Sequence, residues 1–320
     1  MNKKGIEMAF SWIFAIIAGA VILFSAIYIT TKMIGTERKV SDTLVAAELD
    51  NLLHPIETNL EDSKYVNIRF VDETRVFNNC SAKGVFGKQQ ISTASKLIGN
   101  DWGEQSVRKT SFNKYIFSRG VEEGKKIHAI VKPFEMPFKI ADLTILYGGN
   151  YCFVNPPSDI EDEINDLSGD GVQDVGVNIS TSLSACPQNA ETVCFNMIGC
   201  DTNVNTLGSS SNIQGSISKD GETVYYYGGS LLLAAIFSDT EIYECQIKRL
   251  MSRAGELGAV YAKKATYLEG SGCSNNLVQD LQSFVVASAI NNSHEFVQQV
   301  VNLANDLEER NGNIAKCKVF

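Results

Sequence analysis

The chain has 320 residues, of which 44% are hydrophobic and 20% charged, and its formal net charge is −9. This apolar content is typical of a folded protein and excludes an intrinsically disordered chain. The negative charge argues against nucleic acid or an anionic lipid surface as the main partner.

The first element is an uncharged apolar run over residues 9–31. A helix rises about 1.5 Å per residue, so this run can cross a hydrocarbon core about 30 Å thick. A helix also pairs its own backbone amides, as lipid requires. The sequence therefore predicts one membrane-spanning helix in contact with lipid, preceded by a short cytoplasmic N-terminus over residues 1–8.

The alternative for this run is a cleaved secretory signal, whose apolar core is about 7–15 residues long and ends at a small-residue site. The run here is longer, and no A-x-A pattern follows Thr31. Cleavage within Ala18-Gly19-Ala20 would leave an apolar stretch at an exposed chain end. We therefore expect an uncleaved anchor.

Small residues recur at four-residue spacing within the run, at Ser11, Ala15 and Gly19. Such a small-xxx-small face allows another helix to approach closely. It indicates self-association in the membrane, although the same residues are also ordinary components of membrane helices.

The positive residues that flank the run do not settle its orientation, because Lys3 and Lys4 precede it and Lys32, Arg38 and Lys39 follow it. The cysteines are more informative. All 8 lie downstream of the run, at Cys80, Cys152, Cys186, Cys194, Cys200, Cys245, Cys273 and Cys317. An even number suits up to four disulfides, which require an oxidising compartment, and their pairing stays open.

Sequons for N-glycosylation begin at Asn79, Asn178 and Asn291, also downstream. We therefore expect the C-terminal part outside the cytoplasm, as an ectodomain in the cell envelope. The alternative is a cytoplasmic domain with free, buried thiols.

Residues 32–62 form the next predicted element. Val40, Leu44, Ala47, Leu52 or Leu53, and Ile56 recur at roughly helical spacing among charged residues. This predicts an amphipathic helix, either a stalk that continues the membrane helix or a short separate helix packed on the ectodomain.

Residues 63–237 are predicted to be β-rich, because their apolar pattern changes to period two. Glycine, asparagine, serine and proline separate the predicted strands. We expect an antiparallel sheet tied by disulfides, with a polar loop region over 156–221. The predicted strands cover residues 65–71, 126–131, 143–147, 151–154, 193–195 and 223–227.

Residues 238–320 are predicted to be helical and to pack on the sheet, which makes the fold α+β. Ser238-Asp-Thr-Glu241 has the form of a capping box. A break is expected near Asn291-Asn292. Cys245 and Cys273 would join helices to the sheet, and Cys317 would hold the C-terminal tail.

One segment has the pattern of a calcium loop. Oxygen side chains stand at positions 1, 3, 5 and 9, a glycine stands at position 6, and position 7 offers a carbonyl oxygen. The residues that would bind the ion are Asp166, Ser168, Asp170, Val172 (by its carbonyl) and Asp174. These nine residues resemble the loops of dockerin-like and FG-GAP-like modules, which implies a structural Ca²⁺.

The match is incomplete, because Val177 occupies the position of the bidentate glutamate in an EF-hand. A ligand from further upstream would have to complete the site. The alternative is a solvated acidic turn. The upstream candidates are Asp159, Glu161, Asp162 and Glu163.

Catalytic motifs are absent from the sequence. It contains no G-x-S-x-G, Walker A, G-x-G-x-x-G or C-x-x-C pattern, and its 3 histidines, His54, His128 and His294, are isolated. We expect no enzymatic activity and no cofactor other than calcium, and an extracytoplasmic hydrolase is the weakest hypothesis.

Two resemblances bear on function. Lys3-Lys4-Gly5-Ile6-Glu7 before the apolar run resembles the class III signal of archaeal type IV pilin-like proteins. This resemblance implies cleavage after Gly5 and assembly into filaments, although Glu7 would be second in the mature chain, where pilins carry the acidic residue fifth. The segments 3–17, 132–142 and 235–250 resemble an uncharacterised family of archaeal single-pass membrane proteins, which implies the topology and no activity.

Our first hypothesis is therefore a membrane-anchored cell-envelope protein whose ectodomain has a structural role or binds a protein partner. The alternative is a pilin-like filament subunit processed after Gly5.

Overall fold

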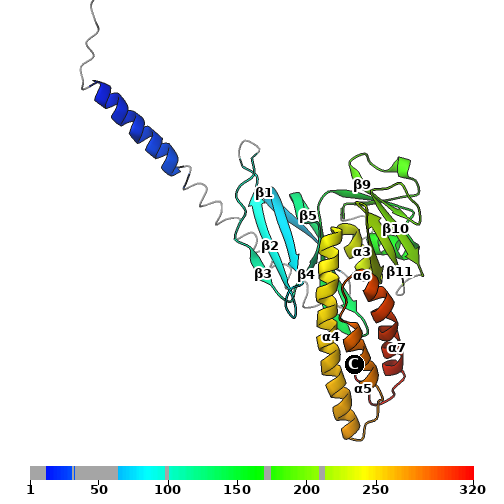
Figure 1. Ribbon diagram of the computed structural model, residues 1–320. Helices are drawn as coiled ribbons and strands as arrows, with labels where there is room; N and C mark the ends of the chain where they lie inside the picture. The colour runs from blue at the N-terminus through cyan, green and yellow to red at the C-terminus, as the bar shows by residue number, and fades with distance from the viewer. Residues whose placement is uncertain (1–11, 31, 33–63, 98–100, 169–173, 209–212) are drawn as a thin grey trace, which may run out of the picture.

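A computed structural model describes residues 12–30, 32, 64–97, 101–168, 174–208 and 213–320. It contains an N-terminal apolar helix, two six-stranded sheets and a group of C-terminal helices (Figure 1). The predicted mixed α+β class is confirmed. The predicted helix over residues 32–62 lies outside the described residues, except for Lys32.

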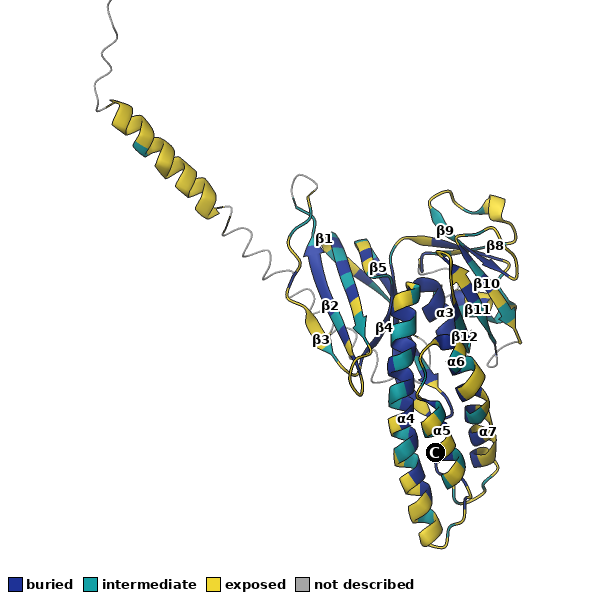
Figure 2. Ribbon diagram, in the orientation of Figure 1, coloured by how far each residue is buried: buried dark blue, intermediate teal, exposed yellow. Residues whose placement is uncertain are grey.

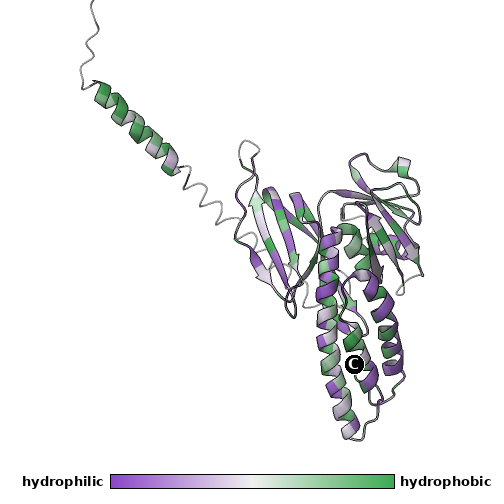
Figure 3. Cartoon of the chain, in the orientation of Figure 1, coloured by the Kyte–Doolittle hydropathy of each residue, from purple (hydrophilic) through white to green (hydrophobic). Residues whose placement is uncertain are grey.

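The N-terminal helix, Trp12–Thr30, has 19 residues with a mean hydropathy of 2.5, and none of the residues in its most apolar window is buried. Figure 3 shows it as a largely hydrophobic helix, and in Figure 2 nearly all of its residues are coloured as exposed. Its length and composition suit a membrane span or a signal sequence.

The first sheet has the order β3-β2-β1-β5-β6-β4. Neighbouring strands are antiparallel, except that β4 runs parallel to β6. The strands are β1 (Lys64–Ser81), β2 (Lys88–Ser95), β3 (Lys109–Ser111), β4 (Tyr115–Phe117), β5 (Val121–Glu135) and β6 (Lys139–Tyr147).

The second sheet has the order β12-β11-β10-β9-β7-β8. Strand β7 is parallel to both β8 and β9, and β9 is parallel to β10, so the prediction of an antiparallel sheet is wrong for this half. The strands are β7 (Asn150–Val154), β8 (Val177–Ser180), β9 (Ala190–Phe195), β10 (Thr202–Leu207), β11 (Gln214–Lys219) and β12 (Glu222–Tyr227).

The region 156–221, predicted to be loop-rich, holds much of this second sheet. A helix, α2 (Ser158–Ser168), and a 3₁₀ turn, η1 (Leu183–Ala185), lie between its strands. Helix α2 connects the parallel strands β7 and β8, as a parallel pair requires. The strands here are short and rich in serine, asparagine and threonine, so their apolar period is weak.

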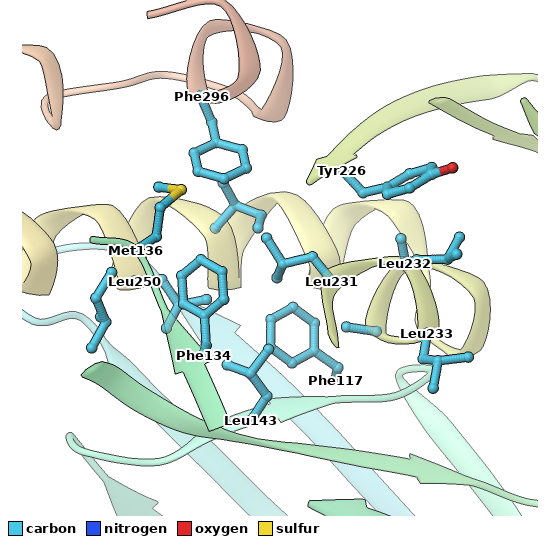
Figure 4. Close-up of a cluster of buried hydrophobic side chains, with 14 of the residues drawn as sticks. Phe117, Phe134, Met136, Leu143, Tyr226, Leu231, Leu232, Leu233, Leu250 and Phe296 are labelled. Atoms are coloured by element: carbon cyan, nitrogen blue, oxygen red, sulfur yellow. The ribbon is translucent and has the colours of Figure 1, made fainter. Parts of the chain in front are cut away.

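The C-terminal helices are α3 (Gly229–Phe237), α4 (Thr240–Gly270), α5 (Val278–Ala287), α6 (Ser293–Glu295), a π turn η3 (Phe296–Val300) and α7 (Val301–Gly312). Helix α3 contacts strands of both sheets, and its residues from Leu231 to Phe237 are at most 2% exposed. A helix that is apolar on all sides has to be buried. Figure 4 shows Leu231, Leu232 and Leu233 among aromatic side chains in the core that joins the two sheets to the helices.

The predicted capping box does not form. Asp239 is the N-cap of α4, and its side chain makes no capping hydrogen bond. Its Oδ2 instead accepts a hydrogen bond from the N–H of Gly120, at 2.7 Å. The predicted break at Asn291-Asn292 is confirmed, since Asn292 is the N-cap of α6 and its side chain accepts a hydrogen bond from the N–H of Glu295.

All eight cysteines are paired, as Cys80–Cys245, Cys152–Cys186, Cys194–Cys200 and Cys273–Cys317. Cys245 joins α4 to β1, as expected. Cys273 does not reach a sheet: it lies just after α4 and bonds Cys317, so this pair holds the C-terminal tail against the end of the helical region.

Candidate binding cleft and the predicted sites

A polar cleft of about 620 Å³ opens where the two sheets meet the junction of α3 and α4. The turn between β4 and β5 contributes one side of it, and the second sheet contributes most of the rest. Its charged residues are Arg119, Glu191, Asp201, Lys219, Asp220 and Asp239.

Arg119 links the two sheets across the cleft. Its guanidinium forms an ion pair with the carboxylate of Glu191 in β9 and lies 5.9 Å from the ring centre of Tyr151 in β7. Because Arg119 is in the turn before β5, the pair connects the first sheet to the second.

Lys219 is one of the residues that line the cleft and is 9% exposed. Its Nζ donates hydrogen bonds to the carbonyl oxygens of Ala235, at 2.8 Å, Ile236, at 3.2 Å, and Ser238. These carbonyls end α3, where the negative end of the helix dipole favours a cation. Burial lowers the pKa of Lys219 to about 8, yet three acceptors match the three N–H donors of an ammonium group. We conclude that Lys219 caps α3 and does not act as a base or nucleophile.

Two of the cleft carboxylates are held by backbone groups. Asp201 accepts hydrogen bonds from the N–H of Thr192, at 2.9 Å, and from its hydroxyl, at 2.7 Å, which lower the pKa of Asp201. Asp239 binds the N–H of Gly120. Asp220 lies in the turn between β11 and β12, where its φ of 53° precedes Gly221 at 79°, as in the tight turns of hairpins.

The charged lining thus comprises four carboxylates and two cations, all in the described part of the chain. An excess of carboxylates suits a ligand that carries positive charge, such as an exposed lysine or arginine side chain of another protein. The described lining includes no histidine, serine or cysteine and shows no nucleophile paired with a base.

Glu122 lies three residues after Arg119 in the chain and is 4% exposed. Its carboxylate accepts hydrogen bonds from the N–H of Gly148, at 2.8 Å, and the N–H of Arg119, at 3.2 Å. Burial outweighs these bonds and raises the pKa of Glu122 to about 7. The group therefore titrates near neutral pH.

The predicted calcium loop is described only at its ends. Ser168 is the last residue of α2 and its hydroxyl donates to the carbonyl oxygen of Asn165, while Asp166 is exposed. Asp174 forms an ion pair with Lys126, at 2.7 Å, and accepts a hydrogen bond from the N–H of Gly176. Asp170 and Val172 lie outside the described residues. Within the described part of the chain, no three histidine, cysteine or acidic side chains gather in a metal-binding arrangement.

Of the four upstream candidates, Glu163 is engaged elsewhere. It forms an ion pair with Lys132, and both side chains are largely buried. Its Oε2 also lies close to Gly229, at the start of α3. Glu163 therefore serves the packing of α2 against β5 and α3.

His128 belongs to a buried cluster next to Asp174. Its Nδ1 is 2.6 Å from the hydroxyl of Tyr65, which also donates to the carbonyl oxygen of Asp174, and its ring stacks on Tyr147 at 4.9 Å. Burial lowers the pKa of His128 to about 4. His294 packs against Tyr225, and His54 lies outside the described residues.

The predicted packing face of the N-terminal helix is described at two of its three positions. Ala15 and Gly19 are exposed, and a Cβ at Gly19 would meet no atom within 4 Å. Ser11 lies outside the described residues. The face is therefore open along its described length.

The cleft residues were not predicted from the sequence. Arg119, Glu191, Lys219 and Asp239 come from separate elements, and no motif connects them. Only Asp220-Gly221 carries a local signal, that of a hairpin turn.

Comparison of the chain with models of protein families, with curated proteins and with solved structures finds no match.

Proposed function

We propose that this chain is a membrane-anchored cell-envelope protein, held by residues 9–31, whose disulfide-linked domain lies outside the cytoplasm and binds a protein partner. The observation that carries the proposal is the combination of an apolar helix without a buried residue and the complete pairing of the cysteines. An exposed apolar surface of this length needs lipid or another apolar surface to cover it.

The disulfides support a location of the domain outside the cytoplasm. Cytoplasmic thiols are kept reduced, whereas four pairs in one domain are typical of secreted and envelope proteins. The pairs close loops of different lengths, with sequence separations of 165, 34, 6 and 44 residues.

The N-glycosylation sequons are also consistent with a domain outside the cytoplasm. Asn79, Asn178 and Asn291 are all exposed and lie on different parts of the domain. A glycan at any of them would extend into solvent without disturbing the core.

The polar cleft supports a binding role. It combines residues of both sheets, and its excess of carboxylates favours a positively charged segment of a partner. A structural Ca²⁺ at residues 166–174 is part of the same proposal, since extracellular modules hold such ions at millimolar concentration.

The anchor is tested by the mass of the protein extracted from its native membrane. We expect an intact N-terminus and a protein that resists carbonate washing but dissolves in detergent as monomers or small oligomers. A mature chain that begins at Ile6 and sediments as a polymer would replace the anchor with the pilin-like alternative. A soluble chain cleaved near residue 20 would show that the run is a signal.

A further inference from the structure

A disulfide-closed loop joins β9 to β10 in the second sheet, and large apolar side chains at this loop are exposed. Met197 and Ile198, within the loop, are 37% and 88% exposed, and Leu207, the last residue of β10, is 62% exposed. None of these three residues lines the polar cleft. We call the three together the apolar patch of the β9–β10 loop.

The loop is fixed at both of its ends. At its start, the side chain of Asn196 donates to the hydroxyl of Thr206, at 2.7 Å, and accepts a hydrogen bond from the N–H of Thr206, at 2.8 Å. At its end, Cys200 exchanges two hydrogen bonds with the side chain of Asn203, at 3.1 and 3.2 Å. The disulfide between Cys194 and Cys200 closes the loop between these contacts.

The same contacts hold the apolar patch together. Leu207 directly follows Thr206, so the hydrogen bonds of Thr206 keep it beside the base of the loop. The sulfur of Met197 accepts a hydrogen bond from the amide of Asn155, at 3.6 Å, which fixes the loop to the chain just after β7. A surface that is ordered before binding loses little conformational entropy on binding, so an exposed isoleucine on it is an efficient anchor.

The charge of this half of the domain indicates what kind of surface it can bind. Residues 140–218 contain ten acidic residues and no lysine or arginine, so they carry more negative charge than the net −9 of the whole chain. Arg119, Lys126 and Lys132 reach this half from the first sheet and its turns, and each forms an ion pair with one of its carboxylates. Such a surface repels anionic lipid and attracts a protein surface that carries positive charge.

We propose that Met197, Ile198 and Leu207 form a docking surface for another protein, in which Ile198 enters an apolar pocket with lysine or arginine at its rim. A side chain that is almost fully exposed can be buried only by a concave site, and the acidic surroundings select a basic rim. This surface rests on the proposed function only in that the partner is a protein. It goes beyond that function because it lies outside the cleft.

Photo-cross-linking in the native cells tests the surface. Benzoylphenylalanine replaces Leu207, Gln188 or Val71 in the full chain, so that Ile198 stays intact. Gln188 lines the cleft, and Val71, which is in β1 and 93% exposed, is a control outside both surfaces. We expect position 207 to cross-link a protein that position 71 does not, and Ile198→Glu to abolish this product.

The three positions also separate the docking surface from the cleft. A protein product from position 188 without one from position 207 would leave the cleft as the binding site and overturn the proposal. Products from neither position would count against both. Products of position 207 that contain lipid or a second copy of this chain would also overturn the proposal.

Binding of the purified cross-linked protein gives a quantitative test. Ile198→Glu should raise Kd at least about tenfold, because an isoleucine side chain is no longer buried, whereas Val71→Glu should leave Kd unchanged. Both substitutions add one negative charge, so the difference between them measures the apolar contact. Added salt should weaken binding by screening the opposite charges. Equal effects of the two substitutions, or binding that salt does not weaken, would contradict the proposal.

Discussion

Cys80 in β1 and Cys245 in α4 form a disulfide bond across 165 residues of sequence. The bond joins the C-terminal end of β1 to the longest helix of the C-terminal region, so most of the domain lies inside the loop that it closes. Next to it, the buried side chain of Gln246 donates to the carbonyl oxygen of Ile116, at 2.9 Å. The covalent and polar contacts therefore fix α4 on the sheet at one place.

The first prediction concerns the length of the closed loops. Replacing both Cys80 and Cys245 by serine should lower the free energy of unfolding by about 5 kcal/mol, because a long loop restricts the unfolded chain most. Replacing Cys194 and Cys200, which are 6 residues apart, should cost about 2 kcal/mol. Denaturant unfolding of the two double variants checks this order, and an equal or reversed loss would contradict it.

The second prediction concerns Arg249, which is 1% exposed. Its guanidinium donates to the carbonyl oxygens of Phe86, Phe112 and Lys114 at 2.8–3.0 Å. Arg249→Met would leave these carbonyls without a donor and should cost about 3 kcal/mol or more. Lys248→Met, on the next residue, serves as the control and should change stability by less than about 1 kcal/mol. A similar loss of stability in both variants would contradict the predicted contribution of the Arg249 hydrogen bonds.

The third prediction concerns Glu122 and alkaline pH. Its pKa is about 7 in the folded protein and 4.5 as the reference for the unfolded chain. The folded state therefore binds this proton more tightly, so its contribution is complete below pH 4.5 and is lost as the pH rises through 7. Glu122→Gln should remove that loss. Between pH 4 and pH 8 the free energy of unfolding of the variant should therefore fall by up to about 3 kcal/mol less than that of the unsubstituted protein. Parallel pH profiles of the two proteins would contradict the raised pKa.

The fourth prediction concerns His128 and acid. Burial holds its pKa at about 4, against 6.5 for the unfolded chain. The unfolded state therefore takes up the proton first, and stability should fall as the pH drops from 6.5 through 4. His128→Gln should weaken this dependence, and His294→Gln is the control on an exposed ring. Thermal unfolding between pH 4 and 7 measures both, and a profile unchanged by His128→Gln would be inconsistent with the account.

The fifth prediction concerns calcium. Millimolar Ca²⁺ should raise Tm of the domain, and Asp166→Asn should reduce this shift because it removes the first ligand of the loop. Asp220→Asn removes an exposed carboxylate in another turn and should keep the shift. If chelator and Ca²⁺ give the same Tm for the unsubstituted protein, the segment is a solvated turn.

The sequence predicted the elements whose apolar pattern is regular. The strands over 65–71, 126–131, 143–147 and 151–154 lie within β1, β5, β6 and β7. Each carries branched or aromatic residues that pack into a core, so the local pattern and the tertiary packing agree. Helix α4 was predicted for the same reason, because its apolar residues form a stripe at helical spacing.

Other elements could not be predicted because their signal comes from tertiary contacts. Helix α3 is apolar on all sides and has no helical period. The connection between β9 and β10 is too short for an ordinary parallel crossover, and it is held by the Cys194–Cys200 bond and by the contact of Asp201 with Thr192. Neither contact follows from spacing along the chain.

The cleft could not be predicted from the sequence either, because it is formed by tertiary contacts. Its cations, Arg119 and Lys219, are 100 residues apart by their numbers and come from different sheets. Each is an ordinary turn or strand residue in the sequence. Only the packing of the two sheets around α3 brings them to one opening.

The most direct test of the account is the state of the cysteines in intact cells. A thiol reagent that enters cells is added before lysis, and the mass of the protein is then measured with and without reduction. We expect no label on the unreduced protein and eight labels after reduction, which would place a fully cross-linked domain outside the cytoplasm. Labelling of all eight cysteines before reduction would contradict that placement.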